Sequence, residues 1–172
     1  MPHEIHAPKI ESAESPREIL AADFNSLGGE LPIRGGWGYS LEDAVVIDKN
    51  DPVVPSGMPF DGVEIEYAFV ESRIYEELII FRPKEERFAG IKWKLLKQSL
   101  THRNGRSYDV LSCEVTAFPV RDWEGLKAEW HGPNGSCSPD FDVDAHLERA
   151  EARKVRYVTE YWFEISSFFG SE

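Results

Sequence analysis

The stretch GIKWKLLKQSLTHRNGRSYDVLSCEVTAF, residues 90–118, carries the clearest structural signal in the sequence. Apolar and polar residues alternate on both sides of Asn104-Gly105, and Asn-Gly is the preferred centre of a type I′ turn because both positions take positive φ. The alternation predicts a long antiparallel hairpin with one apolar face. That face would carry Ile91, Trp93, Leu95, Leu111, Cys113, Val115 and Ala117, opposite Lys92 and Lys94.

Further strands are predicted on either side of this hairpin. Residues 44–47 are β-prone, residues 63–69 alternate between apolar and mostly acidic side chains, and residues 155–165 alternate over a longer run. Residues 78–81 are typical of a buried strand, although residues 72–78 also fit a helix. We therefore expect a mainly antiparallel sheet of about five or six strands.

Two to four helices are expected to pack against this sheet. Ser15, Pro16 and Glu18 form a capping box with proline at the first helical position, and Gly28-Gly29 would end that helix. Asp122 and Asp144 are expected to cap two later helices, the second over residues 145–153. Residues 1–14 lack periodicity and are predicted to be a loose tail, which leaves residues 15–172 as a single α+β domain.

The composition is typical of a folded, soluble protein. The chain has 172 residues, of which 41% are hydrophobic and 29% charged. Its N-terminus has no basic leader and its aliphatic runs are only a few residues long, so we expect neither a signal peptide nor a membrane partner. Cys113 and Cys137 lack CxxC spacing, which disfavours a metal or redox pair. A cytoplasmic location and no cofactor are expected.

Charge is distributed unevenly along the chain. The formal net charge is −12, yet residues 82–106 carry a net +6, because eight basic residues there accompany two acidic ones. The overall negative field opposes sequence-independent contacts with phosphates, so no nucleic acid partner is expected. Such a field would instead steer a basic protein partner. The alternative is that the acidity only keeps the protein soluble.

The glycine-rich stretch GGWGYSLED, residues 35–43, follows Arg34 and raises the question of a phosphate cradle. A P-loop needs Lys and Ser or Thr directly after its last glycine, whereas Tyr39 and Ser40 follow Gly38. The acids that follow would also repel an anion. We therefore predict a structural turn, and Arg34, Trp37 and Tyr39 remain candidate ligand-binding residues only if the two aromatic rings line an open cavity.

Residues 140–151 resemble a calcium loop in the spacing of their acids. Asp140, Asp142, Asp144 and Glu151 occupy positions 1, 3, 5 and 12 of such a loop. Position 6 is Ala145, where a glycine normally makes the sharp turn, and no incoming helix can form through the preceding HGPNGSCSP. The favoured interpretation is an acidic segment that precedes an N-capped helix, and the alternative is a metal site.

No catalytic residue can be named, because the histidines stand outside any local motif and neither GxSxG nor HExxH occurs. The sequence favours a protein-binding module. It resembles inhibitors and immunity proteins in composition, but no motif supports that resemblance. One alternative is a small-ligand-binding protein or enzyme with a pocket over the sheet near Trp37, Tyr39 and Trp93. Another is a homodimer that buries Trp162 or Phe168-Phe169.

Overall fold

The predicted hairpin forms the longest part of the sheet. The computed structural model describes residues 2–24 and 30–170. Strands β4 (Phe88–Arg103) and β5 (Arg106–Pro119) pair antiparallel along their length. The turn between them holds Asn104 at φ 53° and Gly105 at φ 75°, as a type I′ turn requires. The hairpin prediction is confirmed, together with the apolar face of β5.

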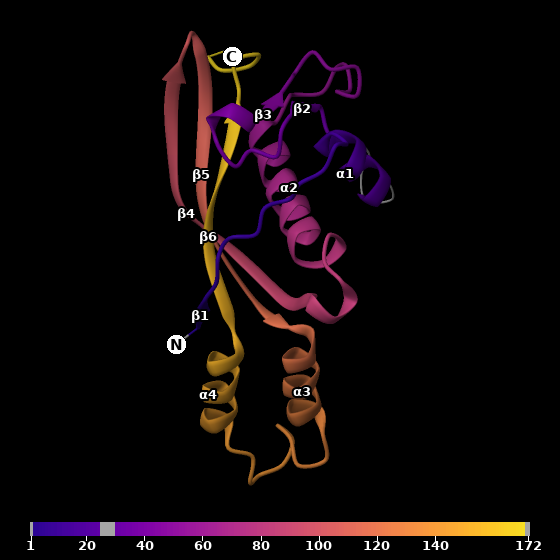
Figure 1. The fold of residues 1–172 in the computed structure, drawn as a ribbon, viewed down its shortest axis with the longest axis vertical. Helices are drawn as coiled ribbons and strands as arrows, with labels where there is room; N and C mark the ends of the chain where they lie inside the picture. Colours follow the sequence, from indigo (N-terminus) through magenta and orange to yellow (C-terminus); the bar gives the residue numbers. More distant parts are fainter. Residues whose placement is uncertain (1, 25–29, 171–172) are drawn as a thin grey trace.

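Strand β6 (Val155–Glu164) lies at the centre of the sheet, although it is the last strand in the chain (Figure 1). The strand order is β2-β3-β6-β5-β4, with β2 (Ile33–Gly35) and β3 (Val45–Ile47) antiparallel to each other. Two short strands pair with the edge of β6 that faces away from β5. The short strand β1 (His3–Glu4) pairs parallel with its beginning, and β3 pairs parallel with its end.

Helices occupy two places relative to this sheet (Figure 1). Helices α1 (Pro16–Phe24) and α2 (Gly62–Tyr75) lie on one side of it, and α2 continues into a π-helical turn at Glu76–Ile80. Helices α3 (Val120–His131) and α4 (Val143–Arg153) project beyond the end of the sheet. Short 3₁₀ turns cover Leu41–Asp43 and Lys84–Glu86. The described residues thus form a compact α+β domain, as predicted.

Helix α2 occupies the segment for which a strand was predicted, and that prediction is wrong. Asp61 caps the helix by accepting a hydrogen bond from the Glu64 amide at 3.1 Å. The residues that face the sheet are Glu66, Phe69, Val70 and Arg73, which recur at helical spacing. Glu66 is buried with them, so the acidic residues did not mark a solvated face. The predicted strand over residues 78–81 is likewise replaced by the π-helical turn.

Two predicted helix caps are also corrected. Helix α3 begins at Val120, directly after Pro119, so Asp122 lies within its first turn. Helix α4 is capped by Asp142, whose carboxylate accepts a hydrogen bond from the Ala145 amide at 3.0 Å. The predicted start of α1 at Pro16 is confirmed, whereas its predicted end at Gly28-Gly29 lies outside the described residues.

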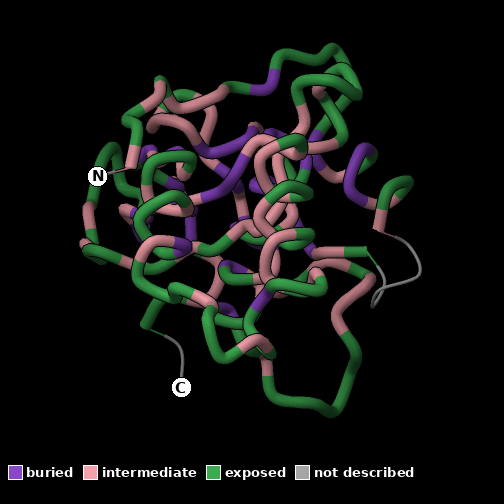
Figure 2. The backbone as a smooth tube through the Cα atoms, turned by 90° about the horizontal axis from the view of Figure 1, so that it is seen from below, coloured by how far each residue is buried: buried purple, intermediate pink, exposed green. Residues whose placement is uncertain are grey.

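The core lies between the sheet and helices α1 and α2, where Figure 2 shows the buried segments of the backbone. Leu111, Cys113 and Val115 of β5 have no exposed surface and pack beneath α2. Residues from the predicted N-terminal tail also lie against the domain. The His3 amide donates to the Lys154 carbonyl at 2.8 Å, and Ile10 is buried in the core. The domain boundary at residue 14 stays a prediction.

Candidate functional site

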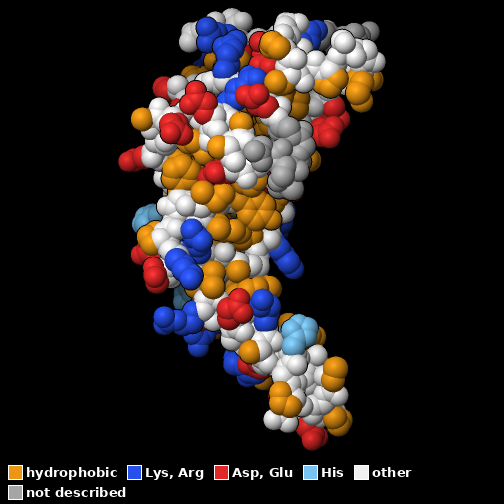
Figure 3. Space-filling view, turned by 90° about the vertical axis from the view of Figure 1, so that its right-hand side faces the viewer, with side chains coloured by type: hydrophobic (Ala, Val, Ile, Leu, Met, Phe, Trp, Pro, Cys, Tyr) orange, Lys and Arg blue, Asp and Glu red, His pale blue; other side chains and the backbone are white. Residues whose placement is uncertain are grey.

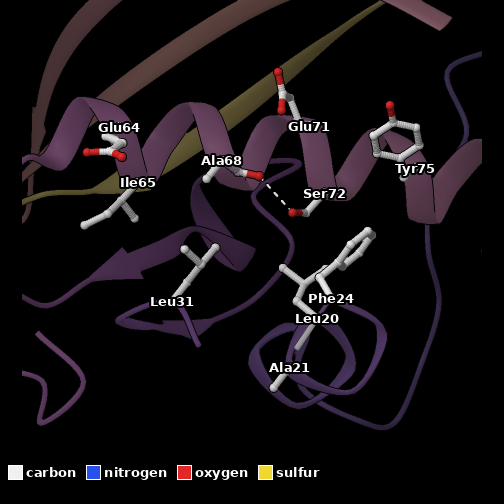
Figure 4. A pocket seen from close by; sticks show the side chains of 10 residues that line it. All are labelled: Leu20, Ala21, Phe24, Leu31, Glu64, Ile65, Ala68, Glu71, Ser72 and Tyr75. Atoms are coloured by element: carbon white, nitrogen blue, oxygen red, sulfur yellow. Dashed lines mark hydrogen bonds between the residues drawn. The ribbon is translucent and has the colours of Figure 1, made fainter. Parts of the chain in front are cut away.

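Helix α2 presents different side chains to its two neighbours. One face packs on the sheet, and the opposite face turns toward α1. Where α1 and α2 diverge, they leave a groove with a cavity of about 370 Å³ (Figure 4). We call this the α1–α2 groove. Its walls are Leu20, Ala21 and Phe24 of α1, Leu31 before β2, and Ile65, Ala68, Ser72 and Tyr75 of α2.

The surface of the α1–α2 groove is mostly apolar. Figure 4 shows the side chains of Ile65 and Ser72 directed from α2 toward α1 and Leu31. The Ser72 hydroxyl donates a hydrogen bond to the Ala68 carbonyl of its own helix at 2.8 Å, so its proton is already engaged. At one end the Phe24 and Tyr75 rings approach to 6.5 Å between centroids. The groove offers an apolar floor with little polar chemistry.

Two carboxylates stand on the α2 rim of the groove. Glu64 and Glu71 are exposed, and neither forms an ion pair with any residue in 2–24 or 30–170. They are seven residues apart on one helix, which places them on the same side and about 10 Å apart along the helix axis. Figure 3 shows hydrophobic side chains gathered over the middle of the face that α1 and α2 share. The described residues therefore form an apolar strip between α1 and α2, with two carboxylates on its rim that have no ion-pair partner among these residues.

The core beneath α2 holds an arginine with no exposed surface. The Arg73 guanidinium donates hydrogen bonds to the carbonyls of Trp37 and Glu160, each at 3.1 Å, and to the Thr159 hydroxyl at 2.9 Å. It forms an ion pair with Glu77, 3.3 Å away and one turn along the helix. These contacts attach α2 to β6 and to the loop before β3, and they fix which face of α2 is left for the groove.

Two aromatic rings enclose the Arg73 guanidinium, at 4.2 Å from the Tyr39 centroid and 3.6 Å from the Tyr161 centroid. The Tyr39 hydroxyl donates to a Glu77 carboxylate oxygen at 2.6 Å and accepts from the Ile10 amide at 2.9 Å. Burial, followed by the nearby Glu77 carboxylate, raises the pKa of Tyr39. Burial also raises the pKa of Glu77, against the opposing effect of Arg73. The cluster is closed to solvent, and its contacts stabilise the fold.

The structure does not gather the sequence-predicted ligand residues into a pocket. Trp37 is buried and packs on Phe69 at 6.2 Å between ring centroids, and Tyr39 belongs to the Arg73 cluster. Arg34 is exposed on β2. Trp93, the third aromatic residue of the predicted pocket, packs edge-on against Tyr67 of α2 at 5.6 Å. The stretch at 35–43 forms a turn whose Asp43 carboxylate accepts from the Ser40 amide at 2.7 Å.

The predicted calcium ligands extend from the turn before α4 to its last turn. Asp142 is engaged as the helix cap, and Glu151 accepts a hydrogen bond from Lys154 at 2.6 Å. Their separation of nine positions corresponds to about 13 Å of helix, far beyond the reach of one ion. Asp140 and Asp144 are exposed. Among the described residues, no three His, Cys, Asp or Glu side chains form a group that could hold a metal ion.

The α1–α2 groove was missed because α2 was mistaken for a strand. Ile65, Ala68, Ser72 and Tyr75 are spaced by three, four and three residues, the pattern of one helical face. Within the described part of the chain, no helix has the length and apolar character needed to cross a bilayer. No family model, curated protein or solved structure matches the chain. Any function is therefore inferred from the site itself.

Proposed function

We propose that this chain is a protein-binding domain whose α1–α2 groove takes an amphipathic helix from a basic partner. The observation that carries the proposal is the pairing of an apolar cavity of about 370 Å³ with two rim carboxylates that have no ion-pair partner among the described residues. Apolar floors with complementary rim charge are typical of helix-in-groove recognition.

The dimensions and charge of the groove define the occupant. Residues 64–75 of α2 correspond to about 16 Å of helix, which matches a partner segment of about 11 residues. Glu64 and Glu71 would face Lys or Arg side chains seven residues apart on that segment, while its apolar face meets Ile65 and Leu31. The net charge of −12 adds long-range attraction for the same partner.

The alternative pocket beside Trp37, Tyr39 and Trp93 has less support. Trp37 is buried, and the Tyr39 hydroxyl is bonded to both Glu77 and the Ile10 amide. A ligand there would have to displace core contacts, whereas the α1–α2 groove already contains a cavity of about 370 Å³.

The test is affinity capture from a lysate of the source organism with wild type and two groove variants. Ala68→Trp fills the groove, and the double substitution Glu64→Lys/Glu71→Lys reverses the charge of its rim. We expect the wild type to retain one stoichiometric basic protein, and both groove variants to lose it. Retention should also weaken as salt rises from 50 to 500 mM.

Matched controls are placed on the exposed surface of α4. Ala152→Trp repeats the bulky substitution and Asp144→Lys/Glu148→Lys repeats the double charge reversal, away from the groove, and both should retain the partner. Circular dichroism of each variant shows that the domain is folded. The proposal is wrong if the groove variants retain every protein that the controls retain, or if the groove-dependent protein is acidic.

A further inference from the structure

Helices α3 and α4 form an arm that projects from the end of the sheet (Figure 1). In α3, Trp123, Leu126 and Trp130 share one face at spacings of three and four, yet no residue of this helix is buried. Tryptophan side chains are usually highly buried in folded domains. These three side chains are half-buried, and the face that they form lies outside the α1–α2 groove.

Contacts at both ends of the arm connect its two helices and set the distance between them. At the outer end, the His146 ring lies 5.1 Å from the Trp130 ring, and Glu129 accepts a hydrogen bond from His146 Nδ1 at 2.8 Å. At the end nearest the sheet, Arg153 donates to Asp122 at 3.2 Å. These contacts join α3 and α4 at the two ends of the space between them.

That space is a cavity of about 260 Å³, which we call the arm cavity. Trp123, Leu126 and Trp130 form one wall, Ala150 of α4 faces them, and Phe118 closes the end. Trp123 is fixed in place because it packs on Phe118 at 5.3 Å and against the bare backbone of Gly90. The cavity suits a flat apolar body of one or two rings.

The ionisable residues that line the arm cavity are all basic types, in contrast to the acidic character of the whole chain. They are Lys127, His131 and His146. The neighbouring Glu129 carboxylate is already engaged by His146 and Arg149, and Glu124 lies 3.6 Å from Lys127 on the exposed side of α3. A ligand in this cavity would meet aromatic faces, two imidazoles and the ammonium of Lys127, which forms an ion pair with Glu124 at 3.6 Å.

We infer that the arm cavity is a second binding site, for a small planar aromatic carboxylate. The ring system lies between Ala150 and the wall formed by Trp123, Leu126 and Trp130, and the carboxylate is held at the rim by Lys127 and His131. This inference does not depend on the α1–α2 groove, because the two sites share no residue.

Naphthalene-2-carboxylate is a suitable probe, with the uncharged naphthalene-2-carboxamide as its matched control. Isothermal titration should show one site with a dissociation constant on the order of 0.1–1 mM for the carboxylate. The carboxamide should bind at least tenfold more weakly, since it lacks the charge-assisted hydrogen bonds. In wild-type NMR spectra, two of the five indole N–H signals, those of Trp123 and Trp130, should shift on titration.

Variants on α3 and α4 locate the site. Ala150→Phe fills the cavity and should abolish binding, whereas Ala152→Phe on the exposed side of α4 should leave it unchanged. Lys127→Gln should weaken binding threefold to tenfold, with the exposed Lys84→Gln as its control. Equal affinity for the two probes, shifts of other indole signals, or no binding at 5 mM would overturn the inference. The wild-type NMR result decides the matter even if Ala150→Phe disturbs α4.

Discussion

Replacing Arg73 by methionine should destabilise the domain strongly, because the change leaves a buried carboxylate without its cation. Arg73 has no exposed surface, and its guanidinium donates to three oxygens at 2.9–3.1 Å besides its ion pair with Glu77. Removing one member of a buried pair costs about 3–5 kcal/mol. Domains of this kind have a total stability of about 5–15 kcal/mol, so Arg73→Met should still fold.

The double substitution Arg73→Met/Glu77→Leu separates the unpaired charge from the loss of contacts. Replacing both members of a buried pair by apolar groups is often close to neutral, so the double variant should recover to within about 1–2 kcal/mol of wild type. Urea unfolding at 25 °C, followed by tryptophan fluorescence, measures each free energy of unfolding. Arg103→Met, on the exposed end of β4, is the control for the substitution itself.

The pH dependence of Arg73→Met supplies an independent check. Burial already raises the pKa of Glu77, and loss of Arg73 removes the main effect that lowers it. A carboxyl whose pKa is raised on folding loses stability as pH rises above its unfolded value, near 4.3. The deficit of Arg73→Met should therefore be larger at pH 8 than at pH 5. A deficit below about 1 kcal/mol, or a double variant no more stable than the single one, would refute this account of the cluster.

Three other changes have defined outcomes. Burial and the neighbouring Asp109 raise the pKa of Glu66 to about 9, so wild-type stability should fall as pH rises from about 4.5 to 9, by at most about 1.4 kcal/mol per pH unit, and Glu66→Gln should flatten that slope in urea titrations. Gly90→Ala should lower the melting temperature more than Gly105→Ala. Both glycines have positive φ, but only at Gly90 would the added carbon meet an indole ring, at 2.7 Å. Iodoacetamide should modify the exposed Cys137 of the folded protein and spare Cys113, which is buried and whose pKa burial raises to about 11; mass spectrometry of peptides distinguishes them.

The parts of the fold that depend on local chemistry could be predicted from the sequence. Asn104-Gly105 specified the hairpin turn, because few other dipeptides accept two positive φ angles. Pro16 after Ser15 marked the start of α1 in the same way. In both cases a single backbone requirement selects the residue type, so the signal does not depend on what packs nearby.

Helix α2 could not be predicted, because its interior breaks the usual link between charge and exposure. Glu66, Arg73 and Glu77 are buried on the face that meets the sheet, where apolar residues were expected. Their partners, such as Tyr39 and Thr159, lie 38 and 86 residues away and become neighbours only in the folded chain. The α1–α2 groove was therefore hidden, since its position follows from which face of α2 is attached to the sheet.

The position of β6 has a consequence for synthesis of the chain. β6 ends 45 residues after β5, so at about 5–20 residues per second the β4–β5 hairpin is complete about 2–9 s before its neighbour is made. During that interval the inner edge of β5 has no strand to pair with, and such edges recruit other chains.

Strand β1 also cannot pair until β6 has been synthesised. Its partners are Val155 and Arg156, at the beginning of β6. The sheet is therefore incomplete until β6 has been made, and a product that stops before residue 155 lacks the strand that joins β5 to β3.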